Sequence, residues 1–314
     1  MNVKHRVIAA LSAVALLTAC SSGSQTPPPL PTTAEGADAL RRDFTTQLLG
    51  RPDAGQESPI QESAFDRLSL PEIVQPEVRS VKMLTVPLRF GLVSRVLVMY
   101  PEGAPKKCAV VYSAGHSGQW DVGGDQAVLV GLRKGCTVAA LEMPGYGRNG
   151  GQIAKTADGH TVDLTSTSLH ERYWMLDEAS ASALDIFVDP VLQTVRYLQR
   201  TEPGVPVVLT GLSGGGYTSM LAAAVDTSVS QTISVAGSGR PTGPEACTED
   251  YEYCATLQRG ATLEQAYYLA AQGPFRRFTE VSIWNDDCCY RQIRAEVYAE
   301  DIAAAVEATG LGQF

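Results

Sequence analysis

A serine lies between glycines at the spacing G-x-S-x-G in the segment Gly211-Leu212-Ser213-Gly214-Gly215. An apolar run ending at Leu209 precedes it, and an alanine-rich, helix-forming run follows it. A sharp strand-to-helix turn strains the backbone of the serine, so only small residues fit two positions before and after it. The pattern predicts a projecting, nucleophilic hydroxyl at Ser213. A phosphate-binding loop is the alternative, but it needs a Gly-Lys-Ser/Thr sequence, and this segment has no lysine.

A second glycine loop, Ser113-Ala114-Gly115-His116-Ser117-Gly118, follows an apolar strand expected to end at Tyr112. With these two loops the chain resembles the α/β-hydrolase superfamily over about residues 78–314, and within it the acetyl-xylan-esterase and dienelactone-hydrolase branch. The resemblance implies that the backbone N–H groups of His116 and Gly214 form an oxyanion hole, each N–H contributing a few kcal/mol. Ala114 replaces a histidine of the family. The His116 ring is expected to line the pocket, and a plain glycine turn is the alternative for this loop.

The resemblance places the catalytic acid after a predicted strand at 278–284, where Asp286 and Asp287 lie. Asp286 is preferred because Cys289 follows it at the spacing where the family has an apolar side chain. Asp287 stays a candidate for the acid. The alternative for both residues is a solvated turn without a catalytic role. The turn Glu142–Arg148 also matches the family, as a structural marker without a catalytic role.

The family order of serine, aspartate and histidine requires a histidine beyond Asp286, and none of the four histidines lies beyond residue 170. Loss of a triad member typically lowers the rate by roughly 10⁴–10⁶-fold. His160 and His170 fall in a lid-like insertion predicted at about 149–172, and a base from there would depart from the family geometry. The sequence therefore predicts either a C-terminally shortened hydrolase or an inactive relative.

Two functions follow from these residues. The first is a serine hydrolase acting on a small carboxylic ester or acyl-sugar, with the catalytic histidine absent from this chain. The second is an inactive hydrolase-fold lipoprotein that serves as a binding or structural module. The expected partner is a small-molecule ester; no metal or organic cofactor is indicated, and no protein partner is identified.

Short apolar segments alternate with helical ones from residue 78 onward, which predicts an α/β-hydrolase fold with a mostly parallel, doubly wound sheet and helices on both faces. The last strand is expected to be missing or incomplete. Helices are predicted at 34–49, up to about 133, from the N-cap Asp189 with Pro190 in the first turn, at 217–225 and at 295–308. Strands are predicted at 81–88, 93–100, 108–112, 137–141, 205–209, 231–236 and 278–284.

The pattern of the N-terminal residues is typical of a targeting segment. Lys4 and Arg6 precede a short apolar run, and Leu17-Thr18-Ala19-Cys20 resembles a bacterial lipobox, which predicts a signal peptide over 1–19 and a lipid on Cys20. A plain secretory signal is the alternative. Residues 20–33, rich in Ser and Pro, are expected to form a disordered tether, followed by a helical and extended segment at 34–77. The expected location is the bacterial cell envelope, lipid-anchored to the outer membrane and facing the periplasm or the surface.

The 314-residue chain carries a net charge of −9, which disfavours nucleic acid as a partner. Six cysteines besides Cys20 would lie in an oxidising compartment. Cys108 and Cys136 each begin an apolar run and would come within bonding reach if the two runs are neighbouring parallel strands. Cys247 and Cys254 close a short acidic loop and are a second possible pair, whereas the pairing of Cys288 and Cys289 stays open. A zinc site at these cysteines is disfavoured because no histidine lies near them in the sequence.

Overall fold

The structure is a computed structural model. It describes residues 29–55, 58–103, 108–116, 118–121, 124–165, 170–178, 182–237, 250–283 and 296–314. The predicted signal peptide, Cys20, Asp286, Asp287, Cys247, Cys288 and Cys289 lie outside these ranges. Their predicted roles stay predictions. No described helix has both the length and the apolar character needed to cross a membrane.

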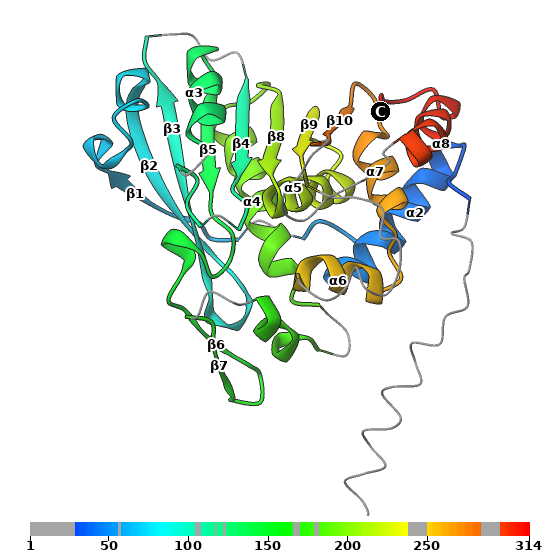
Figure 1. Ribbon diagram of the computed structural model, residues 1–314, viewed down its shortest axis with the longest axis horizontal. Coiled ribbons are helices and arrows are strands. Elements are labelled where there is room, and N and C mark those ends of the chain that lie inside the picture. Colours follow the sequence, from blue (N-terminus) through cyan, green and yellow to red (C-terminus); the bar gives the residue numbers. More distant parts are fainter. Residues whose placement is uncertain are drawn as a thin grey trace, which may run out of the picture.

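The helices and strands follow one another along the chain in largely alternating order (Figure 1). In sequence they are α2 (Ala34–Leu49), β1 (Gln61–Phe65), β2 (Val78–Pro87), β3 (Val93–Pro101), β4 (Ala109–Ser113), α3 (Asp125–Arg133), β5 (Thr137–Leu141), β6 (Ile153–Lys155), β7 (Thr161–Asp163), α4 (Asp185–Thr201), β8 (Val207–Leu212), α5 (Gly214–Val225), β9 (Gln231–Val235), α6 (Tyr251–Gln258), α7 (Leu263–Ala271), β10 (Arg277–Val281) and α8 (Glu296–Ala308).

The main sheet has eight strands in the order β1-β2-β3-β5-β4-β8-β9-β10, running from left to right in Figure 1. β1, β2 and β3 pair antiparallel, and so do β3 and β5. From β5 through β4, β8 and β9 to β10 every pairing is parallel. Ser113 pairs with Gly211, so the carboxyl ends of β4 and β8 lie side by side at one edge of the sheet. This confirms the predicted mostly parallel sheet.

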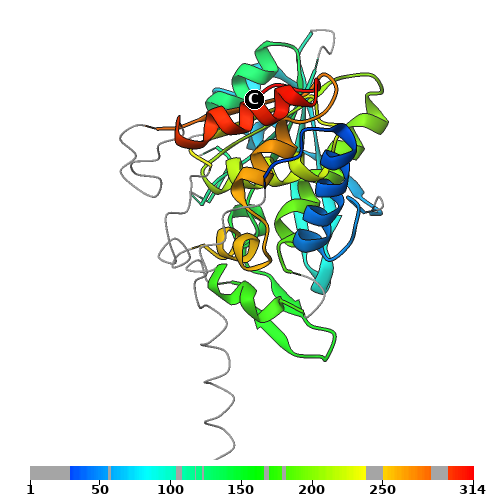
Figure 2. The same ribbon diagram turned by 90° about the vertical axis from the view of Figure 1, so that its right-hand side faces the viewer.

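Buried apolar side chains alternate between the two faces of the sheet. Val111 and Ala139 belong to the larger core, whereas their neighbours Val110 and Val138 belong to a smaller one. The smaller core includes side chains of α3, and the larger one includes side chains of α2, α4, α5, α7 and α8. Figure 2 shows α2, α7 and α8 grouped at the β10 end of the molecule. Both faces are therefore covered by helices, as strands apolar on both sides require.

The sequence placed the start of α4 wrongly. The helix begins at Asp185, and Pro190 lies inside it. Asp189 does not cap the helix; its carboxylate pairs with Arg51. The segment before Pro190 stays helical because Ile186 and Phe187 are buried in the larger core, and burial of this kind outweighs the local preference of proline for a first turn.

The chain reaches the edge of the sheet again at its described C-terminus. Gln313 forms a parallel bridge with Arg277, and the N–H of Phe278 donates to the Gln313 carbonyl at 2.9 Å. A single bridge stands where the sequence predicts a missing or incomplete last strand. The Phe314 ring stacks on Phe278 at a centroid distance of 5.8 Å, which attaches this end to β10.

Cys108 and Cys136 form a disulfide, with 4.6 Å between their Cα atoms. They stand just before the neighbouring parallel strands β4 and β5, which confirms this predicted pair. Cys254 is buried in α6. Its predicted partner is not described, so that second pair stays a prediction.

Two buried arginines join the C-terminal ends of α5 and α7. The Arg276 guanidinium donates to the carbonyls of Ala223, Asp226, Val229, Leu269 and Gln272 at 2.6–3.3 Å. Arg41 of α2 donates to Leu269 and Gln272 as well. Burial, with the nearby charge of Arg41, lowers the pKa of Arg276 to about 9, so the side chain is still charged at pH 7.

Replacing Arg276 by alanine should lower the free energy of unfolding by about 3 kcal/mol, because several buried carbonyls lose their donor at once. Urea unfolding followed by circular dichroism measures the change. Arg277→Ala is the matched control: this neighbouring side chain is exposed and bonds the Gln313 side chain. Its effect should stay within about 0.5 kcal/mol. Equal losses in the two variants would contradict a stabilising role for the buried guanidinium.

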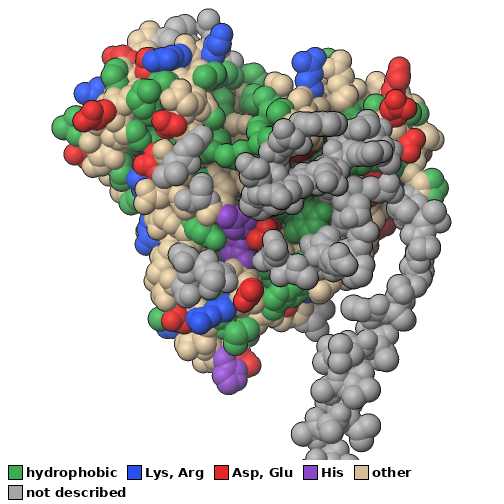
Figure 3. Space-filling model, viewed as in Figure 1, with side chains coloured by type: hydrophobic (Ala, Val, Ile, Leu, Met, Phe, Trp, Pro, Cys, Tyr) green, Lys and Arg blue, Asp and Glu red, His purple; other side chains and the backbone are tan. Residues whose placement is uncertain are grey.

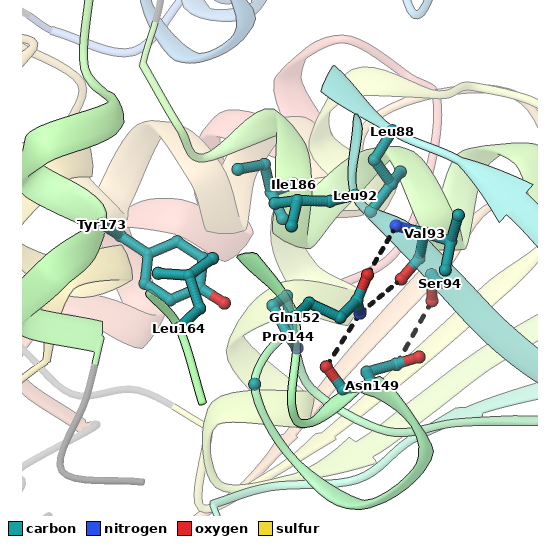
Figure 4. Close-up of a pocket in the computed structure, with 11 residues that line it drawn as sticks. Leu88, Leu92, Val93, Ser94, Pro144, Asn149, Gln152, Leu164, Tyr173 and Ile186 are labelled. Atoms are coloured by element: carbon teal, nitrogen blue, oxygen red, sulfur yellow. Dashed lines mark hydrogen bonds between the residues drawn. The ribbon is translucent and has the colours of Figure 1, made fainter. Parts of the chain in front are cut away.

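The insertion between β5 and α4 contains the β6–β7 hairpin and the short helix His170–Leu176. Figure 4 shows how it is attached to β3: the Gln152 amide accepts from the Val93 N–H at 2.9 Å and donates to the Val93 carbonyl at 2.8 Å. A small cavity beside this contact is lined mainly by apolar side chains, among them Leu92, Tyr173 and Ile186. The insertion is thus packed on the sheet. Its predicted action as a lid is not tested.

Candidate active site

Ser213 stands at the turn between β8 and α5 with φ 55° and ψ −131°, the strained backbone that the G-x-S-x-G pattern predicts. A Cβ at position 211 would lie 2.4 Å from the carbonyl of Gly215. A Cβ at position 215 would lie 2.0 Å from the carbonyl oxygen of Ser113. Only glycine fits at these two places. Ser213 itself is half-buried.

The loop after β4 lies directly against this turn. A Cβ at Gly115 would come within 3.0 Å of the Ser213 Cβ and 2.6 Å of the Leu212 carbonyl oxygen. The N–H groups of His116 and Gly214, predicted as oxyanion donors, donate to no other described residue. Both belong to loops that meet at Ser213, where a developing oxyanion would need them.

The His116 ring packs on the backbone of Gly214. A Cβ at Gly214 would lie 2.6 Å from Cε1 and 2.9 Å from Nδ1 of His116, so this edge of the ring faces the serine turn. The opposite nitrogen, Nε2, lies 3.0 Å from Oε1 of Glu252. The His116 ring was expected only to line the pocket. The structure instead places the ring between the serine turn and a carboxylate.

His170 lies on the other side of Glu252. Its Nδ1 is 2.9 Å from Glu252 Oε2 and 3.1 Å from His116 Nε2, and its Nε2 is 3.1 Å from the carbonyl oxygen of Pro144. The His170 and Glu252 side chains are 3% and 2% exposed, so water has almost no access to this pair. Neither ring nitrogen of His170 is left to face Ser213. Figure 3 shows histidine and acidic atoms side by side near the centre of one face of the molecule.

Glu252 is held by the elements around it. The neighbouring Tyr251 hydroxyl donates to Asp177 at 2.6 Å and lies 2.8 Å from the Ser182 hydroxyl, which fastens the start of α6 to the insertion. Burial alone would raise the pKa of Glu252, but the facing His170 and His116 hold it well below its ordinary value. Burial likewise opposes protonation of His116, and Glu252 more than offsets this and raises the pKa of that histidine.

The turn Glu142–Arg148 has the structural role that the sequence predicts. The buried Glu142 carboxylate pairs with the Arg148 guanidinium at 2.6 Å and accepts from the Arg148 N–H. This turn carries Pro144, whose carbonyl oxygen contacts His170. The turn therefore orients His170, and its Met143 side chain also packs against Gly214 of the serine turn.

His160 lies away from the site. Its side chain is 82% exposed beside β7, and it lies 3.5 Å from the carboxylate of Asp158, which is also exposed. Of the two histidines that the sequence weighed as substitute bases, only His170 joins the cluster.

Neither Asp250 nor Glu252 was predicted from the sequence as a site residue, and only the short acidic loop between Cys247 and Cys254 that contains both was noted. The signal was the acidic run at 249–252, which follows a parallel strand whose carboxyl end lies at the same edge as Ser213. Helix α6, which carries Glu252, was not predicted at all.

No model of a known family and no curated protein matches the chain. Solved structures do match. A glucuronoyl esterase from Solibacter usitatus superposes with a TM-score of 0.59 at 13% identity, over 93% of this chain and 88% of the other. The chain has an α/β-hydrolase fold. Acetyl xylan esterase 1 from Thermoanaerobacterium sp. JW/SL YS485 superposes with a TM-score of 0.54 at 14% identity, over 90% of this chain and 96% of the other. A glucuronoyl esterase from Teredinibacter turnerae T7901 superposes with a TM-score of 0.55 at 15% identity, over 91% of this chain and 78% of the other.

Proposed function

We propose that this α/β-hydrolase-fold protein is a serine hydrolase of carboxylic esters, with Ser213 as nucleophile, His116 as general base and Glu252 as the acid that orients the base. The observation that carries the proposal is the position of the His116 ring, whose Nδ1 edge faces the serine turn while Nε2 lies 3.0 Å from a buried carboxylate. Nucleophile, base and orienting acid are the three parts that acyl transfer needs.

Glu252 selects the useful tautomer of His116. A carboxylate accepts hydrogen bonds only, so the proton of the neutral imidazole resides on Nε2 and the lone pair stays on Nδ1. That lone pair can take the Ser213 proton as Oγ attacks the ester carbonyl. Glu252 then stabilises the imidazolium that forms. No described hydrogen bond joins Ser213 Oγ to His116, and such bonds often tighten only when substrate is bound.

The remaining steps use groups already in the loops. The tetrahedral intermediate places its oxyanion on the N–H groups of His116 and Gly214, and the imidazolium returns its proton to the leaving alcohol. Water, deprotonated by the same ring, then attacks the acyl carbon; the bond to Ser213 Oγ breaks, the acid leaves, and the ring returns its proton to Oγ. In this arrangement the base comes from the loop after β4, whereas the family order places it after the acid. Asp286 and Asp287 stay candidates for the acid, and an assay of Asp286→Asn beside Glu252→Gln separates the two assignments.

The substrate class we propose is an acylated sugar or a small acyl ester. Two of the matching structures bear the names glucuronoyl esterase and acetyl xylan esterase, which makes carbohydrate esters the first substrates to assay. The purified full chain should hydrolyse p-nitrophenyl acetate and acetylated xylo-oligosaccharides with saturation, and p-nitroanilide amides far more slowly. Absence of hydrolysis of every ester, with an intact fold, would favour the inactive binding lipoprotein instead.

A further inference from the structure

We infer that His116, His170, Asp250 and Glu252 bind one divalent metal ion of the zinc class, and that the bound ion blocks ester hydrolysis. The binding part depends only on the geometry of the four side chains. The blocking part rests on the proposed function, because it requires His116 to be the base.

The four side chains each bring one ligand atom to the same place, and these atoms all lie within 4.8 Å of one another. His116 Nε2 lies 3.1 Å from His170 Nδ1, 3.0 Å from Glu252 Oε1 and 3.5 Å from Asp250 Oδ1. In a tetrahedral site with metal–ligand bonds of about 2.1 Å, neighbouring ligand atoms stand roughly 3.4 Å apart. Side-chain movements that separate the nearest pairs slightly and bring the more distant ones closer would therefore give this cluster the dimensions of a zinc site.

The hydrogen-bond pattern at His170 calls for a cation. Its Nε2 faces the Pro144 carbonyl, which only accepts, so the proton of the neutral ring belongs on that nitrogen. The lone pair of Nδ1 then points at Glu252 Oε2 from 2.9 Å, and two electron-rich atoms face one another. The single proton on His116 Nε2, 3.1 Å from this lone pair, is shared with Glu252, whereas a metal ion among these atoms would accept all of their lone pairs at once. A metal-ligating histidine commonly donates its other N–H to a backbone carbonyl, as His170 does to Pro144.

Charge and access also suit a divalent ion. Two neutral imidazoles and two carboxylates carry a charge of −2, which such an ion neutralises, and the nitrogen and oxygen donors match zinc better than calcium. The inner ligands, His170 and Glu252, are both buried, and the His170 ring packs against Tyr173 and Phe187. The outer ligands are partly open: the His116 and Asp250 side chains are 24% and 37% exposed. An ion could enter from this side.

Metal binding and catalysis compete for His116. With Nε2 coordinated, the single proton of the neutral ring moves to Nδ1, which can then no longer accept the Ser213 proton. Zinc should therefore act as a reversible inhibitor, and a chelator should restore the full rate.

Binding is tested by titrating Zn²⁺ into the chelator-treated full chain against a chromophoric zinc indicator. The wild type should take up one ion that His170→Ala binds at least ten-fold more weakly, whereas His160→Ala, which removes an exposed histidine, should match the wild type. Asp250→Asn, altered at a partly exposed position, serves if His170→Ala does not fold. Equal zinc affinity in the wild type and these ligand variants would overturn the site.

Inhibition is tested on the same samples with p-nitrophenyl acetate. The zinc concentration that halves the rate should rise in His170→Ala by the same factor as the dissociation constant, each variant being compared with its own metal-free rate. Faster hydrolysis with zinc, or no change at saturating zinc, would overturn the blocking role. If no ester is hydrolysed at all, the proposed function fails while the binding titration still decides the metal site.

Discussion

Replacing Ser213 by alanine should abolish ester hydrolysis and leave the fold intact. The hydroxyl is the proposed nucleophile, and loss of a serine nucleophile in such a site typically lowers the rate by roughly 10⁴–10⁶-fold. Stability should change little, because the side chain is half-buried and the strained turn is fixed by backbone bonds, among them Ser213 N–H to the Val235 carbonyl at 2.9 Å. Initial rates with p-nitrophenyl acetate, measured with a chelator present, give the effect.

Ser63→Ala is the matched control for this variant. Ser63 is an exposed serine on β1, at the opposite end of the sheet order from β10 and several strands from β8. Its rate should equal that of the wild type. If Ser213→Ala keeps more than about one per cent of the wild-type rate, another group performs the attack, and the nucleophile assignment is wrong.

Replacing His116 by glutamine should lower kcat by roughly 10³–10⁴-fold with a small effect on KM. Glutamine can still donate a hydrogen bond to Glu252, but it cannot take up the proton of Ser213. The loss therefore reports the base and not the packing of the loop. Steady-state kinetics with a chelator present separate kcat from KM.

The same substitution at the other two histidines provides the comparison for this loss of kcat. His170→Gln should lower kcat by at most about ten-fold, because His170 contacts Glu252 and does not face the serine turn. His160→Gln should have no effect, since its side chain is exposed away from the cluster. A loss in His170→Gln as large as that in His116→Gln would transfer the role of base to His170.

The serine turn could be predicted from sequence because its constraints are local. Gly211 and Gly215 fit only where a Cβ would clash with neighbouring backbone, and the apolar run before Ser213 fixes the entering strand. The parallel sheet was predictable for the same reason, since short strands buried on both faces show as continuous apolar runs.

The base and its acid were not predictable in this way because they come together only in the folded chain. His116 follows β4, His170 lies in the insertion after β5 and Glu252 lies at the start of α6, and no local motif marks any of the three side chains as a base or an acid. The family order of serine, acid and histidine places the base after the acid, whereas His116 precedes Ser213 in the chain, so the family order did not predict it as the base. The start of α4 was wrong for a related reason: the Asp189-Pro190 pattern is local, whereas the contacts that extend the helix to Asp185 are tertiary, among them the ion pair of Asp185 with Arg89 at 2.6 Å.

The most direct test of the account is the rate at which a fluorophosphonate probe bonds to Ser213. Such probes react with serines whose hydroxyl is activated, in one covalent step that needs no known substrate. Peptide mass spectrometry locates the adduct and, at timed intervals, gives its rate constant in the wild type and in His116→Gln. The account predicts labelling at Ser213 in the wild type and a rate at least about 100-fold lower in His116→Gln. Equal rates in the two proteins, or labelling at a different residue, would contradict it.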